Sequence, residues 1–97
     1  MTIGSLHVTL RLRESRTLKD KRQVLRSIQD RLRNQFHVAV SEVGHHDDVK
    51  VIEFGIAAIG HEVGAIRTLL QTIQEALRAH PIAEYLQGEL SVGHEVV

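Results

Sequence analysis

The sequence contains no cysteine and no tryptophan, and few other aromatic residues. Without cysteine, disulfide frameworks, thiolate zinc sites and thiol catalysis are excluded within these residues. The only aromatic side chains are Phe36, Phe54 and Tyr85, too few for a platform on which nucleic-acid bases stack. No apolar run approaches the length of a membrane-spanning helix, and the first residues lack a signal-peptide pattern. We therefore expect a cytoplasmic protein with no membrane partner.

The composition is otherwise that of an ordinary globular domain. A chain of 97 residues, 42% of them apolar, is long enough to bury a core without disulfides or metal. No linker, repeat or low-complexity segment interrupts it. We expect one domain over residues 1–97.

The charges sum to zero but are segregated along the chain. Residues 11–33 carry nine bases and three acids, a net +6, whereas residues 34–97 carry three bases and nine acids, a net −6. This asymmetry favours an anionic partner for one surface or electrostatic self-association. The alternative is a solvated basic helix that forms intramolecular ion pairs with the acidic remainder.

The hydrophobic pattern alternates between periods of two and 3.6 residues. Period two predicts strands over 5–13, 37–43, 49–59 and 83–96, and period 3.6 predicts helices over 18–35 and 62–79. Thr17 suits a helix N-cap, with Asp20 in the acidic position of a capping box. The order predicts an α+β, ferredoxin-like βαββαβ fold, an antiparallel four-stranded sheet with two helices on one face.

Four short stretches resemble a known family. They read Thr-Leu-Lys-Asp-Lys-Arg at 17–22, Val-Ala-Val-Ser-Glu-Val at 38–43, Phe-Gly-Ile-Ala at 54–57 and His-Pro at 80–81. In order and spacing they are similar to the YlxP-like family, small bacterial proteins of unknown function. The resemblance implies a ferredoxin-like fold and a role near ribosomal RNA, since members are often encoded among translation and ribosome-maturation genes. Asp-Asp-Val-Lys at 47–50 departs from the Asp-Leu-Trp-Gln stretch that members often carry there.

Basic residues gather at the start of the first predicted helix and along one side of it. A helix N-terminus combines free N–H groups with partial positive charge, so added cations make a site for phosphate. Lys21 is the exception to the basic stripe, because its helical angle falls within the apolar arc; we expect its stem to be buried and its amine to reach the rim. The candidate anion- or RNA-binding residues are Arg13, Arg16, Lys19, Lys21, Arg22, Arg26 and Arg33.

The expected mode of RNA binding is recognition of the backbone. RNA recognition motifs share this fold but need stacking aromatics on their exposed strands, and no Gly-x-x-Gly clamp is present. The sequence therefore predicts binding of structured RNA, ribosomal RNA or a ribosomal particle, through the first helix, with a strong dependence on salt.

The bare face of the predicted sheet offers a second function. Its small and half-polar side chains would let two copies pack together, which predicts a homodimer; the candidate dimer-face residues are Ala39, Glu53, Gly55 and Ala57. The alternative function is therefore a homo-oligomeric interaction module whose basic helix contacts an acidic protein.

No catalytic or metal constellation stands out. The run His45-His46-Asp47-Asp48 reads as a solvated turn, since no further ligand fixes a metal site. The phosphate-binding Gly-x-Val-x-Gly loop of acylphosphatases, which share the fold, is absent. We expect a non-catalytic protein with no cofactor, in which histidines paired with acids make assembly sensitive to pH.

Overall fold

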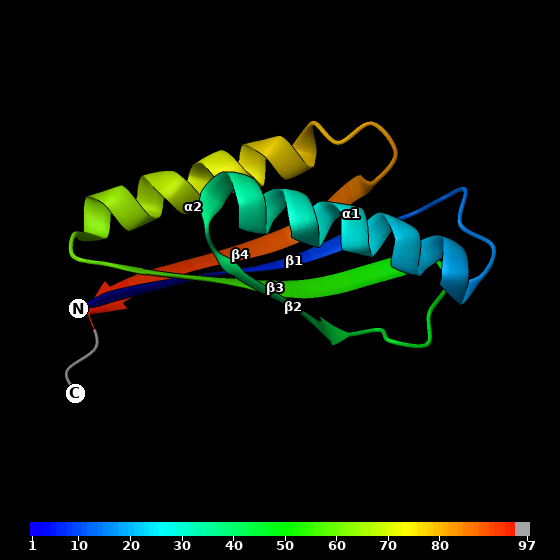
Figure 1. Cartoon of the computed structure of the whole chain (residues 1–97), viewed down its shortest axis with the longest axis horizontal. Helices are drawn as coiled ribbons and strands as arrows, with labels where there is room; N and C mark the ends of the chain where they lie inside the picture. The colour runs from blue at the N-terminus through cyan, green and yellow to red at the C-terminus, as the bar shows by residue number, and fades with distance from the viewer. Residues whose placement is uncertain (95–97) are drawn as a thin grey trace.

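The computed structural model describes residues 1–94 and has the expected order of elements (Figure 1). The elements are β1 (Thr2–Arg11), α1 (Leu18–Phe36), β2 (Ala39–Gly44), β3 (Val51–Gly60), α2 (Val63–Arg78) and β4 (Glu84–His94). All strand pairs are antiparallel, and the sheet order is β2-β3-β1-β4. The ferredoxin-like α+β prediction is confirmed. The end of the predicted last strand, residues 95–96, lies outside the described residues.

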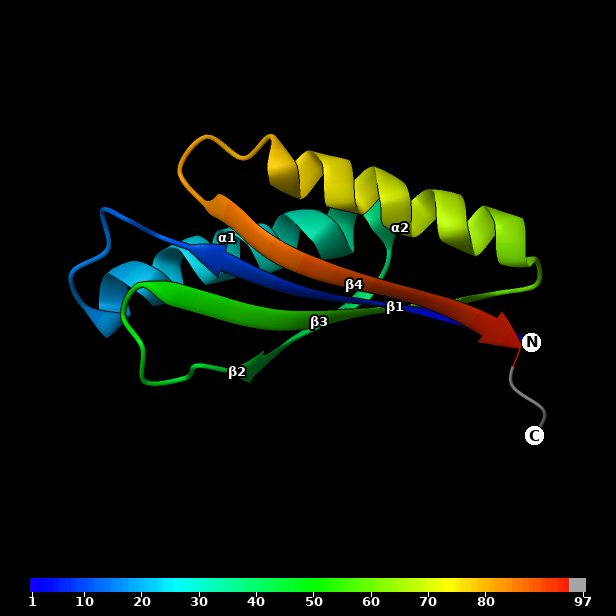
Figure 2. The same ribbon diagram turned by 180° about the vertical axis from the view of Figure 1, so that it is seen from behind.

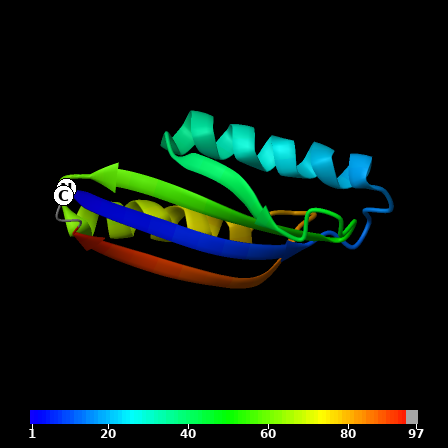
Figure 3. The ribbon, with the colours of Figure 1, turned by 90° about the horizontal axis from the view of Figure 1, so that it is seen from below.

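Both helices lie on the same side of the sheet, α1 over the β2 half and α2 over β1 and β4 (Figures 1 and 2). Seen from below, the strands form one twisted layer in front of α2 (Figure 3). The core lies between these layers and is built from every second strand residue and one stripe of each helix. Its fully buried members include Leu6, Val8, Leu10, Ile52, Phe54, Ile56, Leu70 and Ile73. The opposite face of the sheet is left bare, as expected.

The first strand begins three residues earlier than the alternation predicts. Thr2 is buried although it is polar, because its hydroxyl donates to the carbonyl of His61 at 3.1 Å. Gly4 is buried because α2 passes so close that an added Cβ would meet Ile66 at 2.5 Å and Leu70 at 2.7 Å. Threonine and glycine do not contribute to a hydrophobic pattern, so the sequence did not mark positions 2 and 4 as facing the core.

The second strand is shorter than predicted and carries a bulge. It begins after His37, which ends α1 in the left-handed conformation with φ 55°. The pairing register of β2 on β3 shifts between Glu42 and Gly44, which leaves Val43 as an extra residue. Before the bulge the alternation is regular, so Glu42 faces the helices, opposite Phe54, as Val40 does. After the bulge Gly44 pairs with Glu53. The regular alternation of β2 thus places an acidic side chain toward α1, where it meets Lys21.

Within the described residues, neither helix is long and apolar enough to cross a membrane.

Candidate nucleic-acid interface

The start of α1 is closed by its own side chains. Thr17 accepts a hydrogen bond from the backbone of Asp20 at 3.1 Å, and the Asp20 carboxylate accepts from the backbones of Thr17 at 3.2 Å and Arg16 at 3.0 Å. The backbone hydrogen bond from Arg16 is the main cause that lowers the pKa of Asp20. The predicted capping box is confirmed. Its carboxylate occupies the position from which a phosphate would approach the helix terminus, so the cap does not favour the anion site expected there.

Lys21 does not belong to the exposed basic surface, which corrects its place among the candidate residues. Its side chain is only 1% exposed, and its amine donates to the carbonyl of His45 and lies 3.2 Å from Oε2 of Glu42. The expectation of a buried stem is confirmed. The amine, however, ends on the β2–β3 loop rather than in solvent, because the carbonyl of His45 and the inward-facing carboxylate of Glu42 receive it there. Lys21 fastens this loop to α1.

Three of the candidate cations form a continuous exposed stripe. Lys19, Arg22 and Arg26 lie on one side of α1, about 10 Å from end to end at 1.5 Å per residue. Within residues 1–94, no acidic side chain lies at ion-pair distance from any of the three. Arg16, just before the helix, is also exposed and outside these ion pairs. We call Lys19, Arg22 and Arg26 the α1 stripe.

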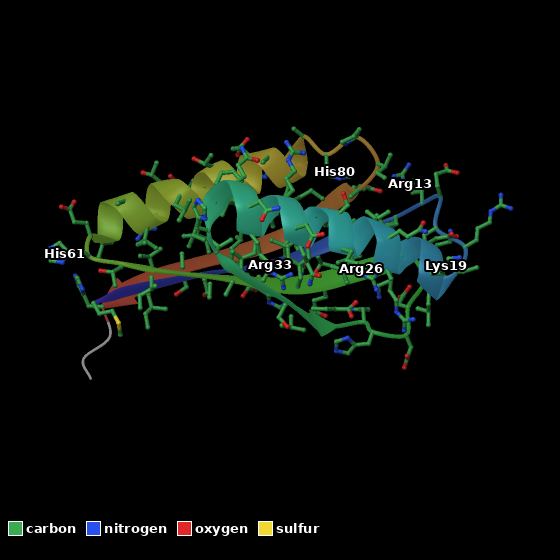
Figure 4. All side chains as sticks on the ribbon, in the orientation of Figure 1. Arg13, Lys19, Arg26, Arg33, His61 and His80 are labelled. Atoms are coloured by element: carbon green, nitrogen blue, oxygen red, sulfur yellow. The ribbon has the colours of Figure 1, made fainter. Side chains whose placement is uncertain are left out.

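The remaining two candidates have structural partners. Arg33 continues the line of the α1 stripe along the side of α1 toward β2, and Nη2 of Arg33 donates to the carbonyl of Val40 at 2.7 Å (Figure 4). Arg33 thereby covers an unpaired carbonyl on the edge of the sheet. Arg13 lies on the other side of α1, toward the α2–β4 connection, where it contacts Oε2 of Glu84 at 2.7 Å (Figure 4). The structure thus places Arg13 apart from the α1 stripe.

The acidic part of the chain does not neutralise the α1 stripe. Glu84 pairs with Arg13, while Glu42 is held by Lys21 and by His46 at 2.8 Å. Burial raises the pKa of Glu42, but hydrogen bonds from His46 and Lys21 outweigh it and leave the pKa below its usual value. None of the intramolecular ion pairs found in the described chain involves a residue of the α1 stripe.

The candidate dimer-face residues do come together on the bare face. Ala39 lies beside Ala57, Gly55 lies beside Ser41, and Glu53 pairs with Gly44 at the bulge. Around these small residues the face is hollowed by a shallow, largely apolar groove of about 400 Å³. The register therefore confirms a shared face; it does not test the dimer itself.

A carboxylate bridged by two histidines was missed in the sequence. Oε2 of Glu53 accepts from His7 at 2.6 Å, and Oε1 accepts from His45 at 2.7 Å. The hydrogen bond from His7, followed by that from His45, holds the pKa of Glu53 below its usual 4.5. The two contacts tie β1 and the β2–β3 loop to β3. Within residues 1–94 no cluster of three or more histidine or acidic side chains is placed to hold a metal ion.

The stability contributed by Glu53 is expected to depend on pH. Because its pKa is lowered by folding, its contribution is fully present above pH 4.5 and is lost as the pH falls through the folded pKa. Glu53→Gln is therefore less stable than the parent protein at pH 6, and the difference shrinks toward pH 3.5. Urea denaturation at both pH values measures it. Glu62→Gln, at an exposed carboxylate that makes no side-chain cap, is the control; a Glu53→Gln deficit independent of pH would contradict the prediction.

A larger hollow, of about 780 Å³, lies where β1 ends and the α2–β4 connection begins. Arg78 lies 4.9 Å from the centre of the Tyr85 ring there, and Arg13 is neutralised by Glu84. Nδ1 of His80 accepts from the backbones of Ile82 and Ala83, and burial, with the charge of Arg31 second, lowers the pKa of His80. His80 is thus neutral and holds the connection after Pro81 in place through these hydrogen bonds. The hollow has no excess of positive charge.

The comparisons with known proteins decide the family. A family model described as a protein of unknown function, DUF503, matches residues 3–89. The chain belongs to the DUF503 family. The uncharacterized protein YlxP of Bacillus subtilis (strain 168) is 35% identical to it over 68 residues, which cover 70% of this chain and 74% of YlxP. The resemblance drawn from the four short stretches is confirmed, and the matched range includes the whole α1 stripe.

Proposed function

We propose that this DUF503 protein is a non-catalytic accessory protein that binds structured RNA, in the setting of a ribosomal particle, through the α1 stripe. The observation that carries the proposal is the exposure of Lys19, Arg22 and Arg26 on one side of α1 with no acidic partner in the described chain. Cations that the fold itself does not neutralise favour an external anion.

The spacing of the α1 stripe supports a phosphate backbone as that anion. Three and four residues of helix separate its members, so neighbouring charges lie about 4.5 and 6 Å apart along the axis, which suits successive phosphates better than one small ligand. Arg22 and Arg26 offer forked donors that bind phosphate in two contacts. Sequence-specific reading of single strands is disfavoured, because within the described residues the bare sheet face presents no phenylalanine, tyrosine or tryptophan.

A second candidate function keeps the same residues and changes the partner. An acidic protein surface also complements three unpaired cations, and Arg33, fixed on the edge of β2, would extend the contact along α1. We favour RNA because the α1 stripe is narrow and none of the large exposed hydrophobic side chains in the described residues lies on α1. Protein interfaces, in contrast, are built around buried apolar or aromatic anchors.

The proposal is tested by charge reversal. Lys19→Glu/Arg22→Glu/Arg26→Glu is expected to lower the affinity for ribosomal RNA and for small ribosomal subunits by at least about 100-fold at low salt, since each change removes one phosphate contact and adds repulsion. Filter binding or sedimentation of subunits measures it.

The matched control reverses three other exposed cations, Arg11, Arg31 and Arg67. It changes the net charge by the same amount, so it should lose only a few-fold of affinity if position matters more than total charge. Equal losses in the two triple variants would place binding elsewhere. No RNA binding by the parent protein at low salt would remove the proposal and leave the acidic protein partner.

A further inference from the structure

The bare face of the sheet has a pronounced relief along the strand direction. At one end Ile3 and Ile59 lie side by side on β1 and β3, and Ile59 is 66% exposed. The next row across the sheet holds only small side chains, from Ala39 through Ala57 and Ser5 to Ser91. The face therefore rises to an apolar ridge, Ile3 and Ile59, beside a flat row.

On the other side of the flat row the face falls into the groove. Gly55 has no side chain, and the nearest atom that a Cβ there would meet is Cγ1 of Val43 at 3.5 Å. Val43, Ala39, Ala57 and Ser41 line the same groove, which holds about 400 Å³. The groove extends from the row of Ala57 to the row of Gly55, where His7 also lines it. Its position without a side chain, Gly55, and the ridge residue Ile59 lie one row each from Ala57, on opposite sides.

We propose that a second copy of this chain covers the face, related by a two-fold axis that crosses the strands at the row of Ala57. Such an axis places the Ile59 ridge of each copy over the Gly55 groove of the other, so that one contact is made twice. The small row at the axis lets the two sheets approach closely. A ridge and a complementary hollow on one face, equidistant from a possible axis, are what an isologous interface requires.

The charges agree with this arrangement. The half of the face around the axis carries neither lysine nor arginine. Its titratable side chains are His7, which lines the groove and is paired with Glu53, and Glu89 on the edge strand β4. Arg11 and Glu53 lie toward the far end of the face, beyond the groove, and Glu84 lies beside Arg11. The proposed packing therefore leaves them in solvent and buries no unpaired charge at its centre.

The size of the overlap sets the expected strength. Across the four strands the proposed contact is about 19 Å wide. Along the strands, from groove to ridge with a margin at each end, it is about 24 Å long. Each copy thus contributes about 450 Å², or about 900 Å² for the pair, which is typical of weak and transient interfaces. We therefore expect a weak dimer whose population rises with protein concentration. Both α1 stripes lie on the helix side of their sheets and stay exposed, so this inference does not depend on RNA binding.

Sedimentation equilibrium between 5 μM and 1 mM on the purified full chain without RNA tests the proposal. The parent protein should dimerise, and Ile59→Arg should weaken the dimer by at least about 30-fold because it places a charge in an apolar groove. Ile82→Arg is the matched control, since Ile82 is 59% exposed but lies in the α2–β4 connection. A monomer throughout, or equal effects of the two variants, overturns the proposal.

A second measurement uses the absence of cysteine from the chain. Ala57→Cys introduces a single thiol at the proposed axis, and a short bis-maleimide that spans the roughly 10 Å between packed sheets should join two copies in high yield. Gln71→Cys, on the exposed side of α2, should be joined only by random collision. Equal yields from the two variants would show that the dimer, if present, uses another surface.

Discussion

Glu42→Ala is expected to destabilise the fold by about 3 kcal/mol, measured by urea denaturation at pH 7. The change removes the carboxylate that faces the amine of Lys21, whose side chain is 1% exposed. Breaking a buried ion pair on one side costs about 3–5 kcal/mol, because the remaining charge is uncompensated. The lower end applies, since Glu42 is 22% exposed and Lys21 keeps its hydrogen bond to the carbonyl of His45.

Replacing Lys21, the other member of the pair, should destabilise the fold less than replacing Glu42. Lys21→Met keeps an unbranched side chain of similar length in the apolar stripe of α1. Oε1 of Glu42 keeps its contact with His46, whereas Oε2, which is closed to solvent, loses the charge that faces it. We expect a loss of about 2 kcal/mol, within the roughly 1–3 kcal/mol cost of a buried acceptor left without a partner, and smaller than that of Glu42→Ala because Oε1 of the carboxylate keeps His46. Glu62→Ala, an exposed acid at the start of α2, controls for the loss of negative charge alone. A larger loss for Lys21→Met than for Glu42→Ala would contradict this account.

This pair matters for function because of where it holds the chain. Lys21 lies between Lys19 and Arg22 in sequence but points to the core side of α1, and its amine fastens the β2–β3 loop. The first turns of α1 are thereby fixed between a capping box and an ion pair. The α1 stripe is presented on a rigid helix, which reduces the ordering cost of binding.

Local patterns were sufficient to predict most of the fold. Both helices follow a 3.6-residue period, and the capping box at Thr17 and Asp20 marks the start of α1. The period also assigned Lys21 to the apolar arc, which its burial confirms. The start of β1 was missed because Thr2 is buried by a hydrogen bond to His61 and Gly4 by the close passage of α2, neither of which is visible in a hydrophobic pattern.

The candidate site was less predictable, because its residues are sorted by tertiary contacts. Lys19 and Arg33 share one side of the helix, but only the structure shows that Arg33 binds a strand-edge carbonyl. Likewise Arg13 is close to the stripe in sequence, yet its partner is 71 residues away in β4. The bridge of Glu53 joins His7 on β1 to His45 in the β2–β3 loop, and the contact with His7, 46 residues away in the chain, depends on the register of β1 against β3, which the hydrophobic pattern alone does not give.

The salt dependence of RNA binding is expected to report the number of phosphates that the α1 stripe contacts. On a duplex each contact contributes about 0.9 to the slope of log affinity against log salt. Lys19, Arg22 and Arg26 together predict a slope of about −2.7, so affinity should fall about 40-fold between 50 and 200 mM salt. If Arg16 makes a fourth contact, the fall should approach 150-fold. Fluorescence anisotropy with a labelled RNA hairpin across this range measures the slope.

Neutral substitutions make the slope diagnostic of position. Lys19→Gln/Arg22→Gln/Arg26→Gln should reduce the slope by about 2.7, because each lost contact releases one fewer counterion. Arg11→Gln/Arg31→Gln/Arg67→Gln removes the same charge from other exposed sites and should leave the slope unchanged. Equal reductions would mean that RNA responds to the overall charge of the protein. A slope near zero for the parent protein would mean that its partner is not held through phosphates, which is the result expected of a contact built on the bare sheet face.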